Sequence, residues 1–291
     1  MPTVRSHGIE LAYETLGGPG DPALLLVMGL GAQLIDWPQG FCEQLAARGF
    51  HVIRFDNRDS GLSAALDELG VPDVAAILRG DRAKAPYVLA DFAADTAGLL
   101  DALGVDRAHV VGASMGGMIA QQLAIDHPDR VLSLCSIMST TGDRSVGRPT
   151  PEAAAVLGQP PAGNREAAIA SAVAASRIIG SPGFPVNEEE LLRRTTAKYD
   201  RAYRPIGTAR QYAAILASPD RTQALYGVTV PTLVIHGEAD PLIDVSGGRA
   251  TAATIPGAEL LVVPGMGHDL PQEAWPQVID AITRNAGWAL V

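Results

Sequence analysis

The sequence has few cysteines, few aromatic residues and no long uninterrupted apolar run. Cys42 and Cys135 are the only cysteines among 291 residues, too few for a disulfide framework, and neither has a histidine at metal-site spacing. We therefore expect both to be small core residues, and we expect no bound metal. The longest apolar stretch, residues 23–32, is interrupted by glycine and is too short to span a bilayer.

Basic residues are outnumbered by acidic ones, and the N-terminus lacks the apolar region of a signal peptide. The chain has 22 Lys and Arg against 32 Asp and Glu, a net charge of −10, with the acidic residues scattered along it. Such a chain is a poor candidate for binding nucleic acid or an anionic membrane. Residues 1–10 are polar. The sequence predicts a soluble, cytoplasmic protein, a monomer or a small homo-oligomer.

The length is sufficient for one large domain with an insertion. Apolar strand-like runs alternate with helix-like stretches over residues 1–138 and 228–291, which predicts an α/β core with a mostly parallel central sheet flanked by helices. The alternation fails over residues 139–227, which predicts a helical insertion. Pro/Gly-rich joints there separate helical stretches near residues 164–179, 187–203 and 207–217.

The most informative motif is Gly112-Ala113-Ser114-Met115-Gly116, because it follows a strand-like run and precedes a helix-like one. A strand that turns at once into a helix places Ser114 on a strained corner, with its hydroxyl over the carboxyl edge of the sheet. Gly112 and Gly116 lack the Cβ atoms that would clash where the two ends meet. The alternative is a tight turn in which the serine has no catalytic role. Further catalytic groups elsewhere in the sequence are needed to decide between the two.

Two such groups follow Ser114 along the chain. A serine hydroxyl needs a base to accept its proton as it attacks, and imidazole suits this task near neutral pH. His268 lies in a Gly-flanked loop after a late strand-like run, and Asp240 follows another run in a Gly-x-x-Asp pattern. We expect Asp240 to fix the imidazole tautomer and to stabilise the imidazolium. Asp244 is a second candidate for this carboxylate and Asp269 a third.

These motifs resemble the α/β-hydrolase superfamily and, within it, the aclacinomycin methylesterase-like esterases. The shared patterns are L-L-L-V-M-G at residues 24–29, G-x-S-M-G at residues 112–116 and P-G-M-G-H at residues 264–268. The order of serine, aspartate and histidine is also that of the superfamily. The likeness covers most of the chain and is weak between residues 140 and 225. It implies an α/β-hydrolase fold with a helical cap inserted after the strand that follows the elbow helix.

The resemblance also implies an oxyanion hole made of two backbone N–H groups. One comes from the loop after the first buried strand, by position from Leu30, and the other from Met115, the residue after the nucleophile. Met28 stands where the superfamily usually has a histidine, as it does in the methylesterase-like group, so this loop must be held in another way. A plain Gly-rich turn is the alternative reading.

A second loop, Asp56-Asn57-Arg58-Asp59-Ser60-Gly61-Leu62-Ser63, resembles the superfamily pattern D-x-R-x-x-G-x-S. We expect Asp56 and Asp59 to be structural, with the loop shaping the floor of the site. We also expect His236 to support the site or merely to end its strand.

Together these features predict a serine hydrolase that cleaves carboxylic esters of small to medium, largely apolar substrates through an acyl-enzyme intermediate, without a metal or organic cofactor. Cofactor-free perhydrolases, thioesterases and C–C hydrolases share the triad and remain alternatives. A serine at the elbow argues against haloalkane dehalogenases and epoxide hydrolases, which carry a carboxylate there. A catalytically silent member that binds a small ligand is the alternative from another class.

Overall fold

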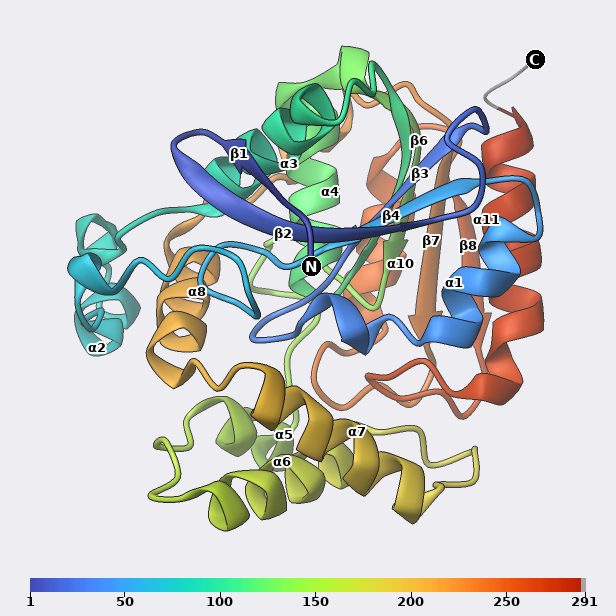
Figure 1. The fold of residues 1–291 in the computed structure, drawn as a ribbon. Helices are drawn as coiled ribbons and strands as arrows, with labels where there is room; N and C mark the ends of the chain where they lie inside the picture. The colour runs from blue at the N-terminus through green and yellow to red at the C-terminus, as the bar shows by residue number, and fades with distance from the viewer. Residues whose placement is uncertain (289–291) are drawn as a thin grey trace.

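An eight-stranded sheet runs through the computed structural model, which describes residues 1–288 (Figure 1). The strand order is β1-β2-β4-β3-β5-β6-β7-β8. β1 pairs antiparallel with β2 and β2 with β4, while all other neighbours are parallel, in agreement with the predicted sheet. The strands are β1 (Thr3–Ser6), β2 (Ile9–Leu16), β3 (Ala23–Val27), β4 (His51–Phe55), β5 (Ala108–Ala113), β6 (Val131–Ile137), β7 (Thr232–Gly237) and β8 (Glu259–Val263).

Helices cover both faces of this sheet because its central strands are apolar on both sides. In β3, Leu25 and Val27 face one core cluster, to which α3 and α4 contribute, whereas Leu24 and Leu26 face a second cluster with α1 and α11. Both cysteines are buried in the second cluster, as expected. The helices of this part are α1 (Gln39–Ala46), α2 (Val74–Leu78), α3 (Leu89–Ala102), α4 (Met115–Asp126), α10 (Ser246–Thr254) and α11 (Trp275–Trp288).

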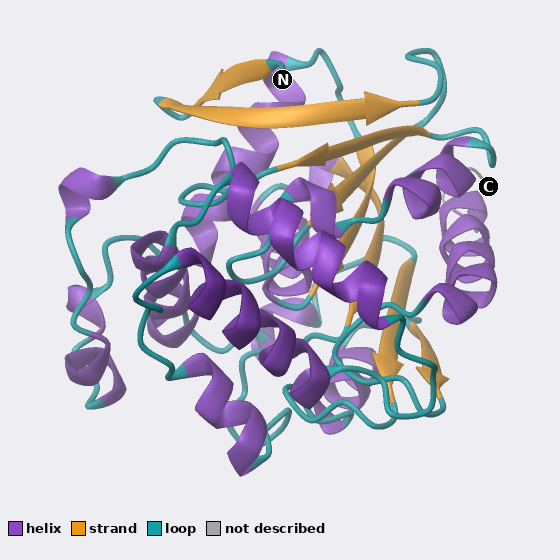
Figure 2. Cartoon of the chain, turned by 60° about the horizontal axis from the view of Figure 1, so that its bottom comes forward, coloured by secondary structure: helices purple, strands orange, loops and turns teal. Residues whose placement is uncertain are grey.

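The segment between β6 and β7 is helical. In Figure 1, α5, α6 and α7 lie below the sheet, at the end toward which the arrow of β7 points, and Figure 2 shows them from that side. The predicted helical stretches correspond to α6, α7 and α8, whereas α5 was not predicted. Proline-rich joints border this short helix, which Thr150 caps by accepting a hydrogen bond from the Ala153 N–H. The helices are α5 (Pro151–Leu157), α6 (Arg165–Ile179), α7 (Glu188–Arg201), α8 (Pro205–Ala217) and α9 (Thr222–Leu225).

Buried ion pairs join α7 and α8 to the loop that follows β4. Arg201 lies 2.7 Å from Asp56, and Arg210 lies 2.6 Å from Asp59. Burial would raise the pKa of Asp59, but hydrogen bonds from Arg210 and Tyr87 hold it below its ordinary value. Both carboxylates are therefore used structurally, as expected from the sequence.

Within residues 1–288, none of the helices combines the length and the apolar character that a membrane crossing requires. The same residues contain no group of three or more His, Cys, Asp or Glu side chains placed to hold a metal ion.

His109 in β5 makes stability depend on pH. Its side chain is buried, with Nδ1 2.9 Å from Ser133 Oγ and the ring edge-on to Phe50. Burial lowers the pKa of His109 to about 4. An unfolded-chain histidine titrates near pH 6.5, so as pH falls the unfolded state binds a proton first. We expect this residue alone to lower the free energy of unfolding by roughly 2 to 3 kcal/mol between about pH 7.5 and about pH 4.5.

Urea unfolding of the wild type and of His109→Gln at these two pH values measures the effect. Glutamine keeps a polar partner for Ser133 but does not titrate. The variant should therefore lose less stability on acidification than the wild type, and an equal loss in both proteins would contradict the assignment.

Candidate active site

Ser114 lies at the turn between β5 and α4, in a backbone conformation that non-glycine residues rarely adopt, with φ 57° and ψ −122°. A Cβ at Gly112 would lie 2.1 Å from the carbonyl oxygen of Gly116. A Cβ at Gly116 would lie 2.1 Å from the carbonyl oxygen of Val27, at the end of β3. Only glycine fits at either position, so the turn packs directly against the neighbouring strand and holds the serine at the sheet edge.

The structure brings Ser114, His268 and Asp240 together in one hydrogen-bonded chain. Ser114 Oγ lies 2.9 Å from His268 Nε2, and His268 Nδ1 lies 2.8 Å from Asp240 Oδ2. The three residues follow β5, β8 and β7, parallel strands of one sheet, so their loops meet at the same edge. This geometry allows the imidazole to take a proton from the hydroxyl while the carboxylate fixes the tautomer.

Asp240 is buried yet surrounded by hydrogen-bond donors. Its Oδ1 accepts the backbone N–H groups of Leu242 at 2.8 Å and Ile243 at 2.9 Å. Burial alone would raise the pKa of Asp240, but hydrogen bonds from His236 and His268, together with the Ile243 N–H, lower it to about 2. The carboxylate is therefore ionised throughout the neutral and mildly acidic range.

The two other candidate carboxylates are engaged elsewhere. Asp244 accepts the backbone N–H of Ser246 at 2.9 Å. Asp269 accepts a hydrogen bond from the Ser181 hydroxyl. Within residues 1–288 neither carboxylate is hydrogen-bonded to His268, so Asp240 is the one that lies on Nδ1.

The loop after β3 lies directly beside the serine. A Cβ at Gly29 would lie 3.0 Å from the Cβ of Ser114 and 3.4 Å from its Oγ. The backbone N–H groups of Leu30 and Met115 donate to no acceptor within the described residues 1–288. Met115 is also the first residue of α4, where the helix dipole favours negative charge. These two N–H groups are therefore candidates for the two donors of an oxyanion hole.

Two side chains hold this loop, in which Met28 stands at the position where the superfamily usually has a histidine. Asn57 Nδ2 donates to the carbonyl of Met28 at 2.9 Å. Gln211 accepts the Gly31 N–H at 2.8 Å and donates to the carbonyl of Arg58 at 2.7 Å. Sequence reasoning missed Gln211, because it lies in α8, 180 residues from its partner, and belongs to no motif.

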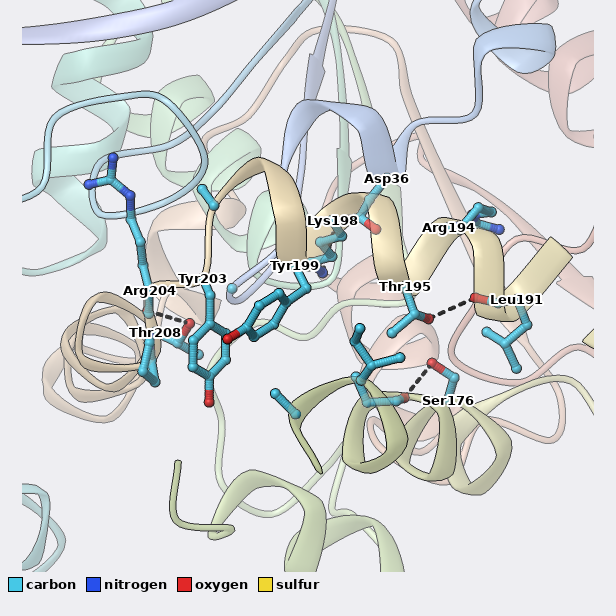
Figure 3. Close-up of a pocket in the computed structure, with 16 residues that line it drawn as sticks. Asp36, Ser176, Leu191, Arg194, Thr195, Lys198, Tyr199, Tyr203, Arg204 and Thr208 are labelled. Carbon is cyan, nitrogen blue, oxygen red and sulfur yellow. Dashed lines mark hydrogen bonds and ion pairs between the residues drawn. The ribbon is translucent and has the colours of Figure 1, made fainter. Parts of the chain in front are cut away.

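A cavity of about 240 Å³ lies between α6, α7 and the start of α8 (Figure 3). Tyr199 and Tyr203 stack there with ring centroids 4.7 Å apart. Gly31, in the loop after β3, also lines the cavity, whereas Ser114, His268 and Asp240 do not. Apolar Ala168, Ile169 and Leu191 line the cavity together with charged Asp36, Arg194 and Lys198.

The chain is similar in sequence to known methylesterases. The rhodomycin D methylesterase DauP of Streptomyces sp. (strain C5) is 33% identical to this chain, and its counterpart DnrP of Streptomyces peucetius is 32% identical; each alignment covers 98% of this chain and 99% of the relative. The predicted resemblance to the methylesterase-like group and the predicted enzyme class, a carboxylic ester hydrolase, are thereby confirmed.

Solved structures agree over the whole length. A hydrolase from Pseudomonas aeruginosa superposes with a TM-score of 0.71 at 28% identity, and a thermophilic esterase from Thermogutta terrifontis with 0.72 at 25%. Both comparisons cover 99% of this chain and 97% of the other. Residues 22–273 match the family model described as the alpha/beta hydrolase fold. With this match, the parallel sheet and the full-length relatives, the chain belongs to the α/β-hydrolase family.

Proposed function

We propose that this protein is a serine hydrolase that cleaves carboxylic esters of small to medium, largely apolar substrates through an acyl-enzyme on Ser114. The observation that carries the proposal is the continuous hydrogen-bonded chain from Ser114 through His268 to Asp240. The two methylesterase relatives support a small alcohol, methanol, as the leaving group. No step of this reaction requires a cofactor.

In the first half-reaction, Ser114 Oγ attacks the ester carbonyl while His268 Nε2 accepts the hydroxyl proton. The carbonyl oxygen becomes negative and is bound by the N–H groups of Leu30 and Met115, each of which contributes roughly 3 kcal/mol in comparable sites. The ester C–O bond then breaks as His268 returns the proton to the departing alcohol oxygen.

In the second half-reaction, water replaces the alcohol. His268 takes a proton from the water as its oxygen attacks the acyl carbon, and the same two N–H groups bind the second oxyanion. The bond to Ser114 Oγ then breaks with return of the proton, which releases the carboxylic acid. Asp240 stays ionised throughout and stabilises the imidazolium, because its pKa of about 2 is far below that of imidazole.

The cavity beside the loop that follows β3 supports the proposed substrate size. Residues 139–227 would act as a cap, and the part of the substrate away from the reacting carbonyl would extend past Gly31 toward Tyr199 and Tyr203. Each methylene buried there is worth about 0.8 kcal/mol. A volume of about 240 Å³ suits a short or medium group and leaves little room for a long acyl chain.

The first prediction concerns the nucleophile. Ser114→Ala should fold normally, with an unchanged thermal unfolding curve, and should lose esterase activity by at least about 10⁴-fold, because no other hydroxyl is activated at the elbow. Hydrolysis of a p-nitrophenyl ester measures the loss. A fluorophosphonate probe, which reacts only with an activated serine, should label the wild type and not the variant. A variant that keeps more than about a tenth of wild-type kcat would contradict the assignment.

The second prediction concerns pH. A protonated imidazole cannot accept the serine proton, so kcat/KM should fall on acidification. Asp240, with a pKa of about 2, does not contribute to this decline. Initial rates from about pH 4.5 to about pH 8.5 test this, and a flat profile would argue against His268 as the base.

The third prediction concerns chain length. Ala168 is buried and lines the cavity, so Ala168→Leu should shift the preference among p-nitrophenyl esters toward shorter acyl chains, by roughly tenfold in the ratio of butyrate to octanoate. Ala170, exposed on the same helix and outside the cavity, provides the control Ala170→Leu. The same shift in both variants, or in neither, would mean that the cavity does not select the substrate.

One further assay separates the proposed reaction from its alternatives. The wild type is compared on carboxylic esters, on an acyl-CoA and on hydrogen peroxide with a carboxylic acid. The proposal requires esters to have the highest kcat/KM. A higher value for the thioester or for peroxide would instead favour a thioesterase or a perhydrolase.

A further inference from the structure

The segment that links α6 to α7 is bonded to the loop that carries His268. The backbone N–H of His268 donates to the carbonyl of Ile179 at 2.7 Å. The Gly183 N–H donates to the carbonyl of Gly265 at 2.9 Å. The proposed catalytic base is therefore held in part by the predicted cap, and not by the sheet alone.

Ser181 is the central side chain of this contact. It is 5% exposed, and its hydroxyl accepts the Gly267 N–H at 2.8 Å while donating to the carboxylate of Asp269. One hydroxyl thus binds the residue on each side of His268. With the Ile179 carbonyl, three consecutive residues of the histidine loop have partners in the segment Ile179–Ser181.

The backbone packing leaves the two segments no room to shift independently. A Cβ at Gly267 would lie 2.2 Å from the carbonyl oxygen of Gly180. A Cβ at Gly183 would lie 2.6 Å from the Cα of Gly265. Since only glycine fits at these positions, the loop and the linking segment pack backbone against backbone, and the Ser181 hydroxyl bonds across this contact.

We propose that Ser181 is a positioning residue for His268, holding the imidazole within reach of Ser114 by fixing the backbone on both sides of it. The proposal rests on the proposed serine hydrolase function. Without the hydroxyl, the buried Gly267 N–H loses its acceptor and the Asp269 carboxylate loses one donor, so the backbone on both sides of His268 is less firmly held. A shift of about 1 Å at the imidazole reduces catalysis by up to about 10²-fold.

The test is Ser181→Ala, assayed for kcat and KM on p-nitrophenyl butyrate. We expect kcat to fall roughly 10- to 100-fold with KM within about twofold of wild type, since the variant leaves the binding cavity intact. Ser171→Ala is the matched control, because this hydroxyl lies on α6 but donates to Gln159 and not to the histidine loop. It should leave both constants unchanged. A kcat for Ser181→Ala within about twofold of wild type would overturn the proposal.

Measuring Ser181→Ala within the His268→Ala variant separates a positioning role from a general disruption of the structure. Ser181 acts through His268, so adding Ser181→Ala to His268→Ala should lower the residual rate no further. An equal loss in both backgrounds would overturn the proposal.

Two more variants keep the test decisive if alanine disturbs folding. Ser181→Thr retains the hydroxyl, whereas Ser181→Val has a side chain of the same shape as threonine with a methyl in place of the hydroxyl. The threonine variant should therefore have a kcat at least about tenfold higher than the valine variant. Equal kcat values would overturn the proposal. Ser114→Ala is measured alongside, because an active Ser114→Ala would overturn the proposed function itself. An inactive Ser114→Ala with a fully active Ser181→Ala would overturn only the positioning role.

Discussion

The contact between the end of β5 and the start of α4 is the constraint on which the site depends. No Cβ fits at Gly112 or Gly116, and Ser114 between them is held at φ 57°, a conformation that costs about 1–3 kcal/mol. That cost is offset by the buried strands around it, since β3 and β5 are buried at every residue. The strain is therefore local, and the parallel sheet brings the acid and base loops to the serine.

A second layer of contacts joins the helices between β6 and β7 to this framework. The Arg210–Asp59 pair is almost completely buried, and the removal of one partner from such a pair typically costs about 3–5 kcal/mol. Gln211, the next residue of α8 after Arg210, accepts a hydrogen bond from the Gly31 N–H in the loop after β3. Arg210 and Gln211, which are consecutive residues of α8, thus contact the loop after β4 and the loop after β3. The ion pair that anchors the helix therefore also positions the side-chain amide of Gln211.

The sequence predicted what depends on short-range patterns and missed what depends on distant partners. The elbow and the strands were predictable, because glycine spacing and apolar runs report local backbone needs. The choice of Asp240 over Asp244 followed from its place in a Gly-x-x-Asp pattern after a strand, which resembles the acid position of the superfamily. Gln211 and Ser181 were not predictable, since their partners lie 180 and 86 residues away and each is an ordinary polar residue in its own surroundings. The division into core and cap at residues 139 and 227 stays a prediction.

These distant contacts bear on how such an insertion can change. If the helices only covered the site, their sequence could vary with the substrate while the reaction rate stayed constant. Here Gln211 of α8 bonds the loop after β3, while the Ile179 carbonyl at the end of α6 and the Ser181 hydroxyl just after it bond the histidine loop. A change in the helices that moves one of these contacts would also move the loop to which it is bonded. Under the proposed function, a substitution in these helices that moves one of these contacts would alter substrate preference and reaction rate together, whereas Ala168 lines the cavity and makes neither contact.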